Sequence, residues 1–157
     1  MIKAFLPAMI DKNRGHITTV ASLAGHLGVA KLVDYVSSKH AAVGTHRALR
    51  AELLVGGSDG IGTTCICPFY IDTGMFAGVN TGTVFSFLKP QEVAEESVKG
   101  ILSDQEMVFL PSINTLLMAM AAAVPVQSSE ALLRLFGVDN SMNTFIGRNQ
   151  PVNRKKV

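Results

Sequence analysis

Tyr35 and Lys39 form an i, i+4 pair in the segment VDYVSSKHAAVG, residues 33–44. On a helix, two residues at this spacing lie on one face, with Cβ atoms about 5–6 Å apart. A free tyrosine has a pKa of about 10 and is a poor base at neutral pH, but a nearby cation favours the phenolate form. The spacing therefore predicts a tyrosine that exchanges a proton with a substrate hydroxyl or carbonyl.

A serine upstream of this pair adds a second polar group to the candidate site. Ser22 ends the β-branched and apolar run HITTVAS, residues 16–22, which is predicted to be a buried strand. Ligands of open α/β sheets bind at the carboxyl ends of strands, so Ser22 can donate a hydrogen bond to the substrate oxygen that Tyr35 serves. Tyrosine and lysine at this spacing are frequent on ordinary helices, and only the strand-end serine makes the pattern informative.

Helices and strands alternate along the chain around these residues. Strands are expected at residues 16–22, 61–69 and 107–111. Helices are expected at residues 2–12 and 34–54, from Pro90 onward, and once or twice more up to Phe136. Apolar strands that alternate with helices are typical of a parallel sheet covered on both faces. We therefore predict an α/β fold of about three parallel strands with flanking helices.

The motifs VAS and YVSSK, followed by ICPFYIDTGMF, resemble the active site of the short-chain dehydrogenase/reductase family. The resemblance covers nearly the whole chain and is closest to the retinol dehydrogenase and hydroxysteroid dehydrogenase branch. It implies an oxidoreductase that uses NAD or NADP to interconvert an alcohol and a carbonyl on a lipid-like substrate of the retinol or steroid type. It also implies a Rossmann-like, doubly wound sheet.

The same resemblance implies a role for each candidate residue. Tyr35 would be the acid/base, and Lys39 would support it and bind the nicotinamide ribose together with it. Ser22 would orient the substrate oxygen. The further cofactor-binding residues that it implies, at the nicotinamide end, are Pro68, Ile71 and Thr73.

The glycine-rich phosphate loop of that family is expected to be missing. GGSDGIG, residues 56–62, matches the spacing G-x-x-x-G-x-G, but its glycines are predicted to follow a helix and precede a strand. A turn of that kind presents no helix N-terminus to a pyrophosphate. Residues 1–147 are therefore expected to be the C-terminal half of a catalytic domain, inactive by itself, and residues 148–157 a mobile basic tail. The alternative is a non-catalytic partner that dimerises with a full-length subunit.

Composition and resemblance together limit the partners. The net charge of +2 gives no argument for nucleic acid, while 48% hydrophobic and 17% charged residues indicate extensive burial or partner surfaces. The resemblance implies a small apolar alcohol or carbonyl substrate, a homo-oligomer formed through helices 2–12 and 34–54, and a place on the cytoplasmic face of the endoplasmic reticulum or on a lipid droplet. No targeting segment is recognised. The uncharged residues 107–129 are expected to form a lid or core helix rather than a membrane span, with membrane-surface contact left open.

Cys65 and Cys67 are expected to be free, buried thiols. Two residues apart on a strand, they share a face but lie too far apart for an unstrained disulfide. Two ligands are too few for a zinc site, and the four histidines show no metal-binding spacing. No metal is expected.

Overall fold

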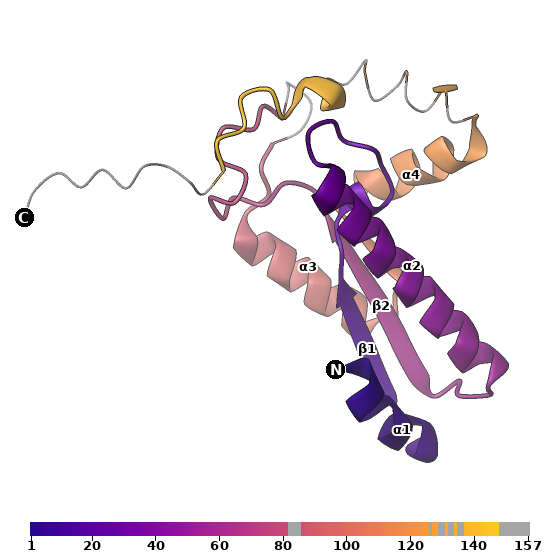
Figure 1. Ribbon diagram of the computed structural model, residues 1–157. Coiled ribbons are helices and arrows are strands. Elements are labelled where there is room, and N and C mark those ends of the chain that lie inside the picture. The colour runs from indigo at the N-terminus through magenta and orange to yellow at the C-terminus, as the bar shows by residue number, and fades with distance from the viewer. Residues whose placement is uncertain (82–85, 126, 129–130, 132–133, 135–136, 148–157) are drawn as a thin grey trace, which may run out of the picture.

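The computed structural model describes residues 1–81, 86–125, 127–128, 131, 134 and 137–147 (Figure 1). Three parallel strands form its sheet, in the spatial order β1 (Gly15–Val20), β2 (Ile61–Pro68) and β3 (Met107–Leu110). In the register, Thr19 lies opposite Cys65, which in turn lies opposite Met107. The predicted α/β fold with about three parallel strands is confirmed.

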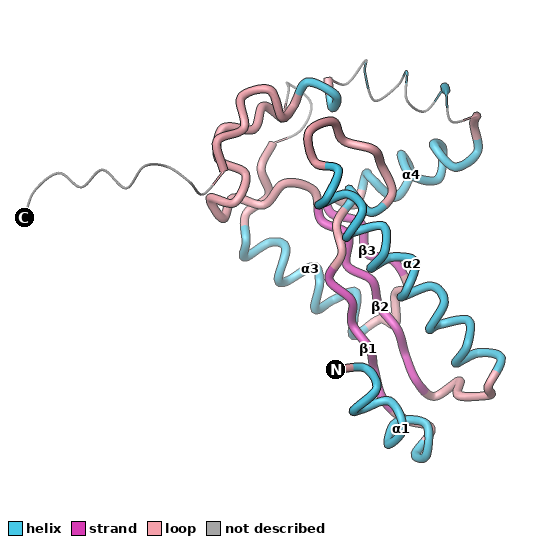
Figure 2. Tube along the Cα trace, in the orientation of Figure 1, coloured by secondary structure: helices cyan, strands magenta, loops and turns pink. Residues whose placement is uncertain are grey.

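The helices lie before, between and after the strands, as Figure 2 shows. They are α1 (Ile2–Lys12), α2 (Val33–Val55), α3 (Pro90–Leu102) and α4 (Ile113–Ala123), with two short 3₁₀ turns, η1 (Leu23–Gly25) and η2 (Val138–Asn140). α3 begins at Pro90, whose fixed φ suits the first helical position, and carries Glu92 in its first turn, where the helix dipole favours an acid. One or two helices were expected up to Phe136: α4 ends at Ala123, residues 127, 128, 131 and 134 are also helical, and residues 135–136 lie outside the described residues.

α2 and α3 cover opposite faces of the sheet. Cys65 and Cys67 pack on Val43 of α2, whereas Ile66, which alternates with them along β2, packs on Val93 of α3. The connections β1–α2–β2 and β2–α3–β3 both move one strand along the sheet in the same direction. Because their helices lie on opposite faces, one crossover is right-handed, as is the strong rule, and the other is left-handed. α1 joins the α2 face through Leu6 and Met9, which pack beside the cluster of Leu49, Leu53 and Ile61.

The glycine-rich segment 56–62 is a turn that joins α2 to β2, as predicted. Gly56 caps α2 and Gly57 takes a positive φ of 71°, which favours glycine. β2 then begins at Ile61. A helix therefore ends at these glycines and none begins there.

Two further expectations concern the cysteines and the uncharged segment. Cys65 and Cys67 are free and buried, with their sulfur atoms 3.8 Å apart in a thiol contact. Within the described part of the chain, no helix combines the length and apolar character that crossing a bilayer requires. The predicted basic tail, residues 148–157, lies outside the described residues.

Candidate active site

Ser22 and Tyr35 line one pocket at the carboxyl ends of the strands. Ser22 follows β1 and caps η1, and its Oγ accepts a hydrogen bond from the Ala24 N–H at 3.2 Å. The same hydroxyl donates to the Pro68 carbonyl at the end of β2, at 3.3 Å. The serine is thus fixed between two strand ends, with 8% of its surface exposed.

Gly25 lets η1 lie directly against α2, which carries Tyr35. A Cβ atom at Gly25 would lie 2.7 Å from Cγ2 of Val43 and 2.8 Å from the carbonyl oxygen of Lys39. Both distances are too short for a side chain to be accepted without displacement of one element. The absence of a side chain at Gly25 therefore brings the Ser22 turn and the Tyr35 helix together.

Tyr35 and Lys39 lie on one face of α2, as their spacing predicts. The Lys39 ammonium lies 5.6 Å from the centroid of the Tyr35 ring, within the range of a cation–π contact, and 3.4 Å from the Val20 carbonyl at the end of β1. The half-buried Tyr35 ring also meets Phe76 edge to face at 5.8 Å. Tyr35 and Lys39 therefore lie beside each other at the carboxyl end of β1.

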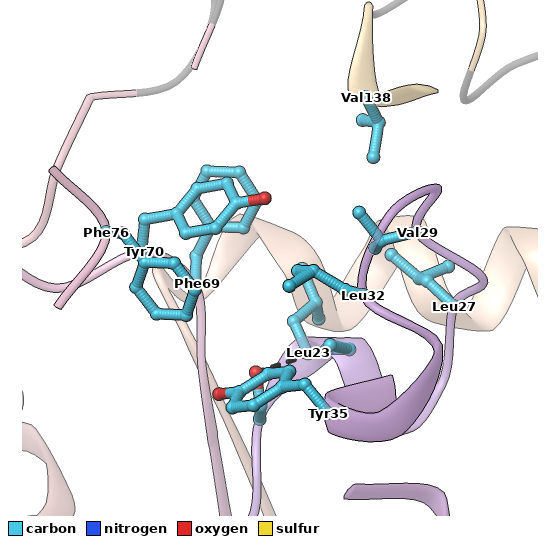
Figure 3. Close-up of a pocket in the computed structure, with 11 residues that line it drawn as sticks. Leu23, Leu27, Val29, Leu32, Tyr35, Phe69, Tyr70, Phe76 and Val138 are labelled. Atoms are coloured by element: carbon cyan, nitrogen blue, oxygen red, sulfur yellow. Dashed lines mark hydrogen bonds between the residues drawn. The ribbon is translucent and has the colours of Figure 1, made fainter. Parts of the chain in front are cut away.

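The pocket is apolar apart from a few hydroxyl groups. Its lining consists of Ser22, Leu23, Ala24, Leu27, Val29, Leu32, Tyr35, Phe69, Tyr70, Phe76 and Val138. Figure 3 shows an aromatic wall of Phe69, Tyr70 and Phe76 facing an aliphatic wall of Leu27 and Val29, with Val138 at the end distant from Tyr35. The arrangement suits a ligand with one reacting oxygen and an apolar body.

Pro68, Ile71 and Thr73, which the resemblance implies for the cofactor, lie beside this pocket and are not among its lining residues. The Pro68 carbonyl accepts the hydroxyl of Ser22, Ile71 forms an isolated bridge with Leu88, and the exposed Thr73 donates its N–H to the Ile71 carbonyl. They form the turn that leaves β2.

The polar groups present fit one end of a dinucleotide. A phenol and an ammonium, both reachable from solvent at a strand end, are donors that suit the hydroxyl groups of a ribose. Among the ion pairs between described residues, none engages Lys39. The described residues include no group of three or more His, Cys, Asp or Glu side chains placed to hold a metal ion.

His26 fastens the turn that follows Ser22 to the sheet. Its Nε2 lies 3.6 Å from the Cys67 sulfur, and its ring meets Phe109 edge to face at 5.1 Å. Burial first, and then the charge of Arg47, lowers the pKa of His26 to about 4, so the ring is neutral near pH 7. A hydrogen bond with Cys65, together with burial, raises the pKa of the Cys67 thiol, which stays protonated.

Sequence reasoning found Ser22 and Tyr35 but not the apolar and aromatic residues that line the rest of the pocket. Phe69 and Tyr70 follow β2 directly, Phe76 lies in the Gly- and Thr-rich loop beyond, and Val138 comes from a distant part of the chain. The available signal was the aromatic content of FYIDTGMF in a segment that otherwise looks like a loop. Val138 gives no comparable signal, because its approach depends on tertiary structure alone.

The chain is similar to members of one known protein family. Residues 1–83 match the model of the family described as short chain dehydrogenase. The chain is 45% identical to estradiol 17-beta-dehydrogenase 11 of Rattus norvegicus, over 87% of this chain and 45% of that protein. It is 41% identical to 17-beta-hydroxysteroid dehydrogenase 13 of Homo sapiens, over 85% of this chain and 44% of that protein. Retinol dehydrogenase 10 of Rattus norvegicus is 38% identical, over 99% of this chain and 47% of that protein.

The chain thus spans about half the length of the curated relatives it matches. Among solved structures, a short chain dehydrogenase from Burkholderia cenocepacia in complex with NADP matches 85% of this chain and 52% of its own, with a TM-score of 0.69 and 23% identity. A short chain dehydrogenase/reductase from Burkholderia phymatum in complex with NAD matches 78% of this chain and 52% of its own, with a TM-score of 0.61 and 19% identity. At these identities the structural likeness establishes the fold.

Proposed function

Because the chain belongs to the short-chain dehydrogenase family, we propose that it carries the substrate side of an NAD(P)-dependent oxidoreductase site. The reaction interconverts an alcohol and a carbonyl on an apolar, lipid-like substrate. The observation that supports this most directly is that Ser22 and Tyr35 line the same, otherwise apolar pocket. The relatives named for estradiol and retinol favour a substrate of that size and character.

Tyr35 is the proton-transfer group in this proposal. Its phenolate would take the proton from a substrate alcohol, or its phenol would give one to a carbonyl oxygen; a nicotinamide cofactor, when bound, would accept or supply the hydride. Lys39 would donate to the ribose hydroxyls of that cofactor. In this proposal Pro68, Ile71 and Thr73, at the end of β2 and just beyond it, line the nicotinamide end of the cofactor.

Ser22 orients the substrate oxygen toward Tyr35. Its hydroxyl hydrogen is directed to the Pro68 carbonyl in this structure, and rotation about a single bond redirects it to a substrate. The aromatic and aliphatic walls exclude water from the reacting oxygen and bind the carbon skeleton. Each buried methylene group of a substrate contributes about 0.8 kcal/mol of binding, which favours lipid-like alcohols over small ones.

We also propose that these 157 residues turn over little by themselves. Within the described part of the chain, the glycine-rich segment 56–62 leads from α2 into β2, so it presents no helix N-terminus to a pyrophosphate. The alternative, a non-catalytic partner, rests on exposed apolar residues of α1 and α2, such as Phe5 and Val55. The same surfaces support a homo-oligomer through α1 and α2.

A turnover assay separates these proposals. The chain is assayed with NAD(H) or NADP(H) and either retinol or a steroid, first alone and then fused behind the N-terminal part of the Rattus norvegicus estradiol 17-beta-dehydrogenase 11 that it does not match. We expect the fusion to be active and the chain alone to show less than about 1% of that rate. A folded fusion that binds cofactor without turnover would contradict the enzymatic proposal. If the chain alone were as active as the fusion, the proposal that it needs an N-terminal half for turnover would be contradicted.

A further inference from the structure

The segment Val138–Gly147, here called the strap, returns to the pocket and closes its end. Val138 lines the pocket, opposite Tyr35 in Figure 3. The strap also binds the loop after β2, because the Asn80 N–H donates to the Ser141 carbonyl at 3.0 Å and the Ile146 N–H donates to the Ala77 carbonyl at 2.9 Å. It therefore connects the far end of the pocket to the loop that bears the aromatic wall.

The strap is tied to the opposite side of the pocket as well. The Lys31 ammonium, in the loop between η1 and α2, donates to Oδ1 of Asn143 at 2.6 Å. This contact is exposed, so its contribution to stability is small. The buried contacts of the strap are those that can hold it in place.

Tyr70 makes the buried contacts. Its hydroxyl lies 3.3 Å from Oγ of Ser141 and 3.7 Å from the sulfur of Met142, and all three residues are at most 8% exposed. Ser141 in turn donates to the Val138 carbonyl at 2.7 Å. Burial raises the pKa of Tyr70, which keeps its hydroxyl protonated. A continuous hydrogen-bonded path thus runs from the Tyr70 hydroxyl through Ser141 to the carbonyl of Val138.

The same tyrosine is connected to the proposed proton-transfer group through the ring of Phe76. The Tyr70 ring packs on Phe76 with centroids 4.9 Å apart, and Phe76 packs on Tyr35 at 5.8 Å. The wall that supports Tyr35 and the anchor of the strap are therefore one packed unit. A substrate that fills the pocket therefore contacts this unit along one side.

We propose that the strap determines substrate specificity, with Val138 as the stop for the apolar end of the substrate and Tyr70 as the positioning residue that fixes this stop. The inference rests on the proposed function, because it assumes that the substrate occupies this pocket. It assigns an elongated apolar alcohol or ketone, whose oxygen meets Ser22 and Tyr35 and whose opposite end contacts Val138. A short alcohol bound at Ser22 and Tyr35 would not reach Val138.

Hydrogen exchange tests the anchor without any substrate. In Tyr70→Phe the ring stays and the hydroxyl is lost, so the Asn80 and Ile146 amides should exchange about five- to tenfold faster. The Cys65 amide, which donates to the Glu106 carbonyl, should be unaffected. Thr63→Val is the matched control, because the Thr63 hydroxyl, on the preceding strand β2, is buried and has no hydrogen-bond partner among the described residues.

Ser141→Ala is a second variant that breaks the same path from the other side. Ser141→Ala also removes the hydrogen bond to the Val138 carbonyl, so it should accelerate exchange by itself. In this background Tyr70→Phe should add less acceleration than it causes in the parent chain, because the contact between the two hydroxyls is already lost. Additive effects, or equal exchange in Tyr70→Phe and Thr63→Val, would overturn the assignment of Tyr70 as the anchor.

Binding of all-trans-retinol, followed by its fluorescence, tests the stop. Val138→Phe should weaken binding at least about tenfold, because a larger side chain shortens the pocket. Val98→Phe, at an exposed position of α3, should leave the Kd within about twofold. Equal affinity of both variants would overturn the role of Val138. Failure of the unchanged chain to bind retinol would contradict the proposed substrate class, while the exchange experiment still decides the anchor.

Discussion

At the residue scale, the chemistry depends on a small number of hydroxyl groups in an apolar pocket. Ser22 and Tyr35 approach from different elements, and the ammonium of Lys39 lies over the tyrosine ring. The neutral ring of His26 holds the turn behind Ser22 through Cys67 and Phe109 without adding a charge beside the site. In the proposed mechanism Tyr35 transfers the proton, whereas His26, Cys67 and Phe109 hold the turn behind Ser22 in place.

The low pKa of His26 makes stability depend on pH. Above pH 6.5 the ring is neutral in both the folded and the unfolded chain; between 6.5 and about 4 only the unfolded chain binds the proton. The free energy of unfolding should therefore fall as the pH falls through this window. Since the ring is only partly buried, the loss is on the order of 1 kcal/mol.

Urea unfolding at pH 7 and pH 5 measures this effect. His46 is 2% exposed, and burial also lowers its pKa, so it contributes in the same direction. His26→Gln isolates the contribution of His26 and should reduce the difference in unfolding free energy between the two pH values. An undiminished difference in that variant would show that His26 is not the group responsible.

At the element scale, the site is assembled where η1 meets α2. The contact requires a glycine at position 25, because any side chain there meets Val43 and the Lys39 backbone. Gly25→Ala should lower the free energy of unfolding by about 1–3 kcal/mol. Gly28→Ala is the control: a Cβ atom there would have nothing within 4 Å, and we expect a change below about 0.5 kcal/mol. Denaturant midpoints that are equal for the two variants would contradict this account of the contact.

The positions of most helices and strands could be predicted from the sequence. Apolar runs and helical spacing identified β1, α2, β2 and β3 to within a few residues. The pairing of Ser22 with Tyr35 followed, because carboxyl ends of parallel strands meet at one edge. The opposite hands of the two crossovers were not predicted, because helix and strand patterns do not specify which face a helix covers. Phe76 and Val138 were missed because both reach the pocket through tertiary contacts alone.

At the scale of the whole molecule, α1 and α2 carry apolar residues that are exposed at the surface. Phe5 is 62% exposed and Val55 is 90% exposed. Exposed apolar surface of this kind favours association. The proposed homo-oligomer through these two helices would bury it.

Sedimentation of the purified chain measures this association. Phe5→Glu should raise the dissociation constant at least about tenfold, since a charge would be buried in the interface. Val98→Glu places the same charge at an exposed position of α3 and should have no effect on association. A monomeric parent chain, or equal association of the two variants, would rule out this interface.

The most direct test of the account is the effect of Tyr35→Phe on turnover in the active fusion. Loss of the proton-transfer group should lower kcat/KM by roughly a hundredfold or more, while retinol still binds. Ser37→Ala, an exposed change two residues along α2, should leave the rate unaltered. If Tyr35→Phe retained a rate within about tenfold of its parent, the phenol of Tyr35 would not be the acid/base, and the central claim would be wrong.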